Sequence, residues 1–242
     1  MDHDRTDPVH TRWIGLPAEG GTMDAYLALP PAGHGPGLLL LQEIFGVNDH
    51  IQGVAEQFAL AGFVVLAPDL FWRQQPHVEL GYEGAERARA LTLMQAMQPA
   101  ATLADLQASV AALRARPEVG ARKVGALGYC MGGRLAWLAA SRCGVDAAVA
   151  YYGGGIQNQL ELAATITGPV QLHYGERDDH IPPDAVESVR AVLAGKPAEV
   201  HVYPGAQHGF NCWARASYDA ASAALALGRS QAFLAGALFA AR

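Results

Sequence analysis

The feature that most constrains the fold is a glycine-rich turn within residues 123–134, KVGALGYCMGGR. Residues 124–127 form a short apolar run typical of a buried strand, and the residues after the turn repeat their apolar positions at helical spacing. A strand that turns at once into a helix holds its apex residue, here Cys130, in a strained backbone conformation. Gly128 and Gly132 remove the Cβ atoms that would otherwise collide there. The pattern predicts that the Cys130 thiol is presented to solvent.

Cys130 has two interpretations at this stage. Glycine-rich turns also form phosphate-binding loops, and a cysteine in an apolar region is more often an inert packing residue. Alternatively, Cys130 is a nucleophile, and the backbone N–H of Met131 lies at a helix N-terminus where developing negative charge is stabilised. The choice between them depends on partners elsewhere in the chain.

Composition narrows the class of protein. With 242 residues, of which 51% are hydrophobic, the chain can form one α/β domain over residues 1–242. The formal net charge of -6 argues against nucleic acid or an acidic membrane surface as partner. No apolar run is long enough to span a bilayer, and residues 1–5 are too polar for a signal peptide. We therefore expect a cytoplasmic protein, a monomer or weak homo-oligomer, that binds a small molecule.

Cysteine usage indicates reduced thiols. The three cysteines, Cys130, Cys143 and Cys212, are odd in number and lack Cys-x-x-Cys spacing. Neither a disulfide framework nor a zinc site is therefore expected, and no other metal or cofactor is predicted.

Strands and helices alternate along the chain. Strands are expected at residues 23–29, 38–41, 63–67, 124–127, 145–151, 170–174 and 199–203. Helices are expected at residues 48–62, 83–98 and 102–115, from 131 onward, at 183–193, and from 214 to the C-terminus, with Thr102 and Asp105 forming a capping box. Such alternation predicts a mainly parallel sheet with helices on both faces.

The loops after the last two predicted strands carry candidate partners for the thiol. Reactive residues of such sheets lie just beyond the carboxyl ends of the strands. Asp178 follows one strand and His208 the other. A thiol needs an imidazole to take its proton, and the imidazole needs a carboxylate to fix its tautomer. Cys130, Asp178 and His208 supply these roles in the order nucleophile, acid, base, although Asp179 could replace Asp178.

Most of the nine histidines need no catalytic role. His173 is expected to be buried within its strand, His201 to point sideways from its own, and His180 to lie at the surface. His208 differs because glycines precede and follow it closely, which lets its loop swing the ring over Cys130. The joint occurrence of thiol, acid and imidazole favours a hydrolase over a packing cysteine.

The sequence resembles the dienelactone hydrolases, also called carboxymethylenebutenolidases, from about residue 10 to the C-terminus. The resemblance rests on residues 42–48 (QEIFGVN), 67–70 (APDL) followed by Arg73, 128–133 (GYCMGG), 151–153 (YYG), 175–178 (GERD) and 208–210 (HGF). It implies a three-layer α/β-hydrolase fold, with a mainly parallel central sheet and helices on both faces. It also implies hydrolysis of a dienelactone-like enol-lactone to a maleylacetate-type product.

The resemblance implies roles for individual residues. Cys130, Asp178 and His208 would form the triad, and the amides of Ile44 and Met131 the oxyanion hole.

Further roles follow from the same resemblance. Glu43 would contact the resting cysteine and help to activate it when substrate enters. Arg73 would bind a substrate carboxylate, since a guanidinium suits a planar carboxylate. Tyr152 and Trp72 would contribute to substrate binding, and Trp72 with Trp213 could line an apolar acyl pocket.

One expected residue is absent. The family's second carboxylate-binding arginine would stand four residues beyond His208, where this chain has Cys212. The role is not transferred to the nearby Arg215, and we expect arginine at position 212 to improve binding of carboxylate-bearing lactones. Two alternatives remain open: a broad-range small-ester esterase, which the thiol disfavours, and a non-catalytic lactone-binding homologue, which would need neither His208 nor Asp178.

Overall fold

Eight strands form one sheet in the computed structural model, which describes residues 8–239. The strands are β1 (His10–Ala18), β2 (Gly21–Leu29), β3 (Gly37–Leu41), β4 (Val64–Pro68), β5 (Val124–Tyr129), β6 (Ala147–Tyr151), β7 (Val170–Gly175) and β8 (Ala198–Tyr203). Their order across the sheet is β1-β2-β4-β3-β5-β6-β7-β8. β1 and β2 are antiparallel to their neighbours, and all strands from β4 to β8 in that order are parallel.

The central strands are confirmed because their burial leaves a clear signal. Every residue of β3, β4, β5, β6 and β7 is buried. Strands buried on both faces are continuous apolar runs, which sequence patterns detect well. β1 was not predicted: it is an edge strand with mostly exposed side chains, so it lacks a strong apolar pattern.

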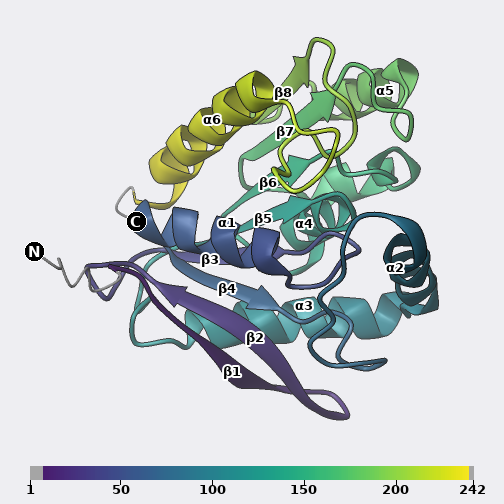
Figure 1. The fold of residues 1–242 in the computed structure, drawn as a ribbon. Coiled ribbons are helices and arrows are strands. Elements are labelled where there is room, and N and C mark those ends of the chain that lie inside the picture. Colours follow the sequence, from purple (N-terminus) through teal and green to yellow (C-terminus); the bar gives the residue numbers. More distant parts are fainter. Residues whose placement is uncertain (1–7, 240–242) are drawn as a thin grey trace, which may run out of the picture.

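Helices cover both faces of the sheet (Figure 1). α1 (Asp49–Leu60) and α6 (Ala220–Leu238) pack on one face, and α3 (Pro99–Arg114), α4 (Met131–Arg142) and α5 (Pro183–Leu193) on the other. α2 (Gly84–Ala96) lies beyond the carboxyl ends of the strands (Figure 1). The predicted three-layer α/β architecture is confirmed.

The predicted start of the 102–115 helix was wrong. α3 begins at Pro99, whose missing N–H costs nothing in the first helical turn. Thr102 therefore lies inside the helix, where its hydroxyl donates to the Gln98 carbonyl oxygen at 3.0 Å. Asp105 does not complete a capping box, because its carboxylate accepts hydrogen bonds from Arg73 and Trp72.

The C-terminal helix also starts later than expected. Asp219 caps α6 by accepting a 2.8 Å hydrogen bond from the Ser222 N–H, so residues 214–219 belong to the preceding loop. Two short 3-10 helices that the sequence did not indicate, η1 (Ile156–Asn158) and η2 (Leu160–Thr165), follow β6. Residues 1–5, used for the signal-peptide expectation, and the last three residues of the predicted C-terminal helix lie outside the described residues. Within residues 8–239, no helix has the length and hydropathy to cross a bilayer.

Candidate active site

Cys130 occupies the apex of the turn between β5 and α4. Its backbone has φ 55° and ψ -114°, a strained conformation for a residue with a side chain. A Cβ atom on Gly128 would collide with the Gly132 carbonyl oxygen, and one on Gly132 would collide with the Leu41 carbonyl oxygen. The glycine pattern therefore permits the sharp turn, as the sequence predicted.

The structure brings Cys130, His208 and Asp178 into one hydrogen-bonded chain. The Cys130 Sγ lies 3.1 Å from His208 Nε2, and His208 Nδ1 lies 2.8 Å from Asp178 Oδ2. The three residues follow β5, β8 and β7, so the carboxyl edge of the sheet gathers them. Asp178 is buried, whereas its neighbour Asp179 is exposed and has no contact with the imidazole. This geometry selects Asp178 as the partner of His208.

His208 is held in its charged form. Burial alone would lower its pKa, but the Coulombic interaction with Cys130 and the hydrogen bond to Asp178 outweigh burial and raise the pKa of His208 to about 10. An imidazolium beside a sulfur atom is the arrangement that stabilises a thiolate nucleophile. The electrostatics of the site therefore suit nucleophilic chemistry at neutral pH.

Two backbone amides are available at the same place. Ile44, after β3, and Met131, the first residue of α4, both line the cavity that Cys130 faces. Within residues 8–239, neither N–H has a hydrogen-bond acceptor. An unpaired N–H pair beside a nucleophile can stabilise an oxyanion.

Glu43 lies close to the site but pairs with Arg215, to which the sequence analysis gave no role. Its buried carboxylate accepts a 3.1 Å hydrogen bond from Arg215 Nη1, and its other oxygen lies 4.0 Å from His50 Nδ1. Among the described residues, no hydrogen bond joins Glu43 to Cys130, and the carboxylate is bonded to Arg215 instead.

Arg73 and Trp72 do not reach the cavity. Arg73 donates two hydrogen bonds to Asp105 of α3, at 3.0 and 2.8 Å, and Trp72 Nε1 donates a third at 3.1 Å. Because Asp105 is buried and needs these donors, the Arg73 guanidinium is held away from Cys130. We therefore do not propose a substrate-binding role for Arg73 or Trp72.

Tyr152 and Trp213 also differ from their expected places. Tyr152 is fully buried with φ 35°, and its ring packs edge-on against His208 with 5.0 Å between centroids. It packs against the imidazole and does not line the cavity. Trp213 is half exposed and packs against His50, so it forms no acyl pocket either.

The cavity beside Cys130 has a volume of about 230 Å³ and both apolar and basic walls. Phe45, Leu91 and Met94 supply apolar surface, and His180, expected only at the surface, contributes to the rim. The basic residues are Arg87 of α2, Arg134 of α4 and Arg215 of the loop after His208. The guanidinium groups of Arg87 and Arg134 have no hydrogen bond or ion pair within residues 8–239.

Sequence reasoning missed Arg87 and Arg134, and it named Arg215 without giving it a role. Arg134 stands four residues after Cys130 on a helix, which places it one turn above the nucleophile and could have been noticed. Arg87 and Arg215 carry no comparable local signal. Cys212 is completely buried and does not line the cavity. Because arginine there would be enclosed by protein, we no longer expect it to improve carboxylate binding.

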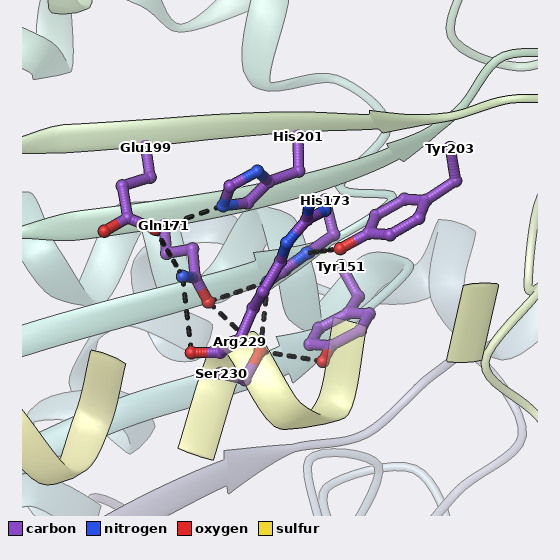
Figure 2. Close-up of polar contacts among 8 residues, drawn as sticks. All are labelled: Tyr151, Gln171, His173, Glu199, His201, Tyr203, Arg229 and Ser230. Atoms are coloured by element: carbon purple, nitrogen blue, oxygen red, sulfur yellow. Dashed lines mark hydrogen bonds and ion pairs between the residues drawn. The ribbon is translucent and has the colours of Figure 1, made fainter. Parts of the chain in front are cut away.

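Two other histidines belong to a polar network between the sheet and α6 (Figure 2). His173 is buried in β7, as predicted, and its ring nitrogens lie 2.7 Å from Tyr203 Oη and 2.8 Å from Gln171 Oε1. Ser230 of α6 adds a contact to His173 and one to Tyr151. Burial lowers the pKa of His173 well below its usual value, so the ring is neutral. His201, the second histidine, contacts Glu199 through Nε2 at 3.1 Å. The network attaches α6 to the sheet, and both ring nitrogens of His173 are engaged within it.

Comparisons with known proteins agree with this geometry. The profile described as the dienelactone hydrolase family matches residues 23–238. A relative from Azospirillum brasilense, assigned as a carboxymethylenebutenolidase, is 39% identical over 227 residues, covering 91% of this chain and 96% of the relative. The carboxymethylenebutenolidase of Pseudomonas putida is 34% identical over 219 residues, covering 90% and 92%. A crystal structure from Klebsiella pneumoniae subsp. pneumoniae, assigned as a dienelactone hydrolase, has a TM-score of 0.83 at 33% identity, covering 94% of this chain and 98% of that one.

Proposed function

Because the chain belongs to the dienelactone hydrolase family and is a lactone or ester hydrolase, we propose that it opens an enol-lactone through a thioester on Cys130. The observation that carries the proposal is the continuous contact from Cys130 Sγ through the His208 imidazole to Asp178. A binding protein would need no such relay, because its function requires no proton transfer.

The proposed reaction has two steps. The Cys130 sulfur attacks the lactone carbonyl as a thiolate, and the ring C–O bond breaks. The leaving oxygen takes the proton of the His208 imidazolium and departs as an enol, which leaves the imidazole neutral. The Ile44 and Met131 amides hold the oxyanion of each tetrahedral intermediate. His208 then takes a proton from water, and the resulting hydroxide attacks the thioester, which returns the thiol and releases the acid. Asp178 keeps the imidazole in the required tautomer.

We propose a carboxylate-bearing substrate because the cavity is basic. Arg87 lies on α2 and Arg134 on α4, and both line the cavity. Neither guanidinium has a protein partner within residues 8–239. A carboxylate can engage a guanidinium through two parallel hydrogen bonds. A product of the maleylacetate type, which carries carboxylates, is therefore compatible with this site.

The test compares the wild type with Cys130→Ser and Cys130→Ala on a dienelactone. We expect turnover to fall by at least about 100-fold in both variants. Serine presents a neutral hydroxyl, which is a poorer nucleophile than a thiolate, and alanine presents no nucleophile. Acid quenching during turnover should reveal an acyl adduct on Cys130 by peptide mass spectrometry. Wild-type turnover in Cys130→Ala would show that the thiol is not the nucleophile.

A second candidate, a broad-range small-ester esterase, is favoured by the apolar wall formed by Phe45, Leu91 and Met94. The two candidates differ in their response to substrate charge. A carboxylate-selective lactonase should prefer a free acid over its methyl ester, whereas an esterase should prefer the neutral ester or treat both alike. Binding of the lactone without any turnover would instead indicate a non-catalytic homologue.

A further inference from the structure

Three buried side chains with metal-binding atoms meet behind the cavity wall. Glu43 follows β3, His50 lies in α1, and Cys212 belongs to the loop after His208. Their carboxylate, imidazole and thiol donor atoms all lie within 4.8 Å of one another. All three residues are at most 1% exposed. Tertiary packing alone brings them together, since no spacing in the sequence relates them.

Some polar atoms of this cluster lack hydrogen bonds, although the Cys212 thiol contacts the Tyr82 hydroxyl. Glu43 Oε2 has no hydrogen bond among the described residues, and neither ring nitrogen of His50 has one of normal length and angle, although the Asn211 backbone lies nearby. Buried polar atoms in native proteins are nearly always hydrogen-bonded, because an unpaired one costs about 1–3 kcal/mol. The unpaired His50 Nδ1 and Glu43 Oε2 belong to different elements and lie 4.0 Å apart. A ligand placed between them would satisfy both atoms.

We propose that Glu43, His50 and Cys212 bind one divalent cation of the zinc class, with a water molecule as the fourth ligand. Carboxylate oxygen, imidazole nitrogen and thiolate sulfur are the three donor types that zinc accepts. The sulfur disfavours magnesium and calcium, which require oxygen ligands. Ligand bonds of about 2.0–2.3 Å place tetrahedral donors roughly 3.3–3.8 Å apart, so the side chains need only small rotations to close on the ion.

The charges at the cluster permit binding of a dication. A neutral imidazole keeps one nitrogen lone pair for a metal. A metal-bound cysteine is a thiolate, so the Cys212 thiol must lose its proton on binding. Binding then forms a metal–sulfur bond and releases that proton to solvent. The Glu43 carboxylate and the Cys212 thiolate together neutralise the ion, while Arg215 can keep its bond to the other Glu43 oxygen.

An acidic groove gives the ion a route to His50. The groove has a volume of about 280 Å³ and is lined by Asn48, Asp49, His50, Glu79, Leu80, Gly81, Tyr82 and Ala214. The Asp49 and Glu79 side chains are exposed, and carboxylates at the mouth of a groove raise the local concentration of cations. The groove is separate from the cavity of Cys130, so the ion would not need to pass the catalytic thiol.

The test measures binding directly, without substrate, and is therefore independent of the proposed reaction. Chelator-treated protein is titrated with Zn²⁺ by calorimetry and with Co²⁺ by absorption spectroscopy. All titrations use a Cys130→Ser background, which removes the thiol beside His208 as a competing ligand. We expect one Zn²⁺ per chain, proton release, and a Co²⁺ spectrum with a thiolate charge-transfer band.

Matched variants then locate the site. Cys212→Ser should abolish the thiolate band and weaken Zn²⁺ binding by at least about 100-fold, because even outer partners of metal ligands contribute 10–100-fold. Cys143→Ser removes a half-buried cysteine outside the cluster and should change nothing. His50→Gln provides a second test if Cys212→Ser fails to fold, with folding checked by circular dichroism. Absence of binding in the Cys130→Ser background, or binding unchanged by His50→Gln and Cys212→Ser, would overturn the proposal.

Discussion

Arg215 donates a hydrogen bond from Nη1 to Glu43 Oε1 over 3.1 Å, joining two loops 172 residues apart in the chain. The side chain of Glu43 is 1% exposed and that of Arg215 is 18% exposed, so the pair is largely shielded from water. Arg215 also lines the cavity beside Cys130. A substrate carboxylate entering the cavity would therefore compete with Glu43 for this guanidinium.

Removing only the basic partner of this pair should destabilise the protein. Arg215→Met leaves the Glu43 carboxylate buried without its cation, which typically costs about 3–5 kcal/mol. We expect the free energy of unfolding, measured in urea, to fall by that amount. The double variant Glu43→Gln with Arg215→Met should recover much of the loss, because no buried charge then remains. Equal stability of the single and double variants would contradict this account.

Arg87 should control substrate affinity and leave stability unchanged. It is exposed on α2 and lines the cavity. Arg87→Ala should raise the KM for a carboxylate-bearing lactone by about tenfold. A hydrogen bond to a charged group contributes about 1.5–3 kcal/mol, and solvent screening at this exposed site reduces that contribution. The KM for the methyl ester should not change. Arg89→Ala is the matched control, because Arg89 lies on the same helix, bonds Gln75 and does not line the cavity.

Arg73 should contribute to stability and leave substrate affinity unchanged. Its guanidinium donates hydrogen bonds to the buried carboxylate of Asp105. Arg73 does not line the cavity beside Cys130. Arg73→Ala should lower the free energy of unfolding by about 1–3 kcal/mol, since Asp105 loses two donors. Because Arg73 is partly exposed, solvent screening places the expected value toward the lower end. The KM of the folded variant should stay at the wild-type value. A large increase would indicate that Arg73 contacts the substrate after all.

Alkylation should distinguish the cysteines. Burial raises the pKa of Cys143 to about 11 and that of Cys212 to about 12, so both are almost entirely protonated at pH 7. Cys130 is partly exposed, and its sulfur contacts the imidazolium of His208. Brief treatment with iodoacetamide at pH 7 should label Cys130 alone, as read by peptide mass spectrometry. Labelling of Cys143 or Cys212 at a similar rate would refute this order of reactivity.

The charged His208 should make stability depend on pH. Its folded-state pKa of about 10 lies above the unfolded value of 6.5. A raised pKa means that the folded state binds the proton more tightly, so the stabilisation is complete below pH 6.5 and is lost as pH rises through about 10. The difference in unfolding free energy between wild type and His208→Gln should therefore shrink from pH 6.5 to pH 10. A difference that stays constant over this range would show that His208 is not charged in the folded protein.

The sequence by itself determined the central sheet and two residues of the proposed relay, Cys130 and His208, and left the acid open between Asp178 and Asp179. Strands such as β3 and β5 are buried on both faces, so their identity is recorded in consecutive apolar residues. The turn at Cys130 needs glycine at positions 128 and 132 for a local steric reason, which makes it visible without any tertiary information. The loops that carry the acid and His208 follow from the rule that loops after parallel strands meet at one edge of the sheet, and the structure then selects Asp178.

Tertiary structure decided which charged groups actually meet. The sequence suggested Arg73 as a substrate-binding residue, but in the structure its guanidinium bonds Asp105 of α3. Arg215 bonds Glu43, which lies 172 residues earlier in the chain. The cluster of Glu43, His50 and Cys212 likewise has no sequence signature, because its members come from three separate elements. The direction of a long side chain and the identity of its partner depend on how distant elements pack, and local residue patterns carry no information about that.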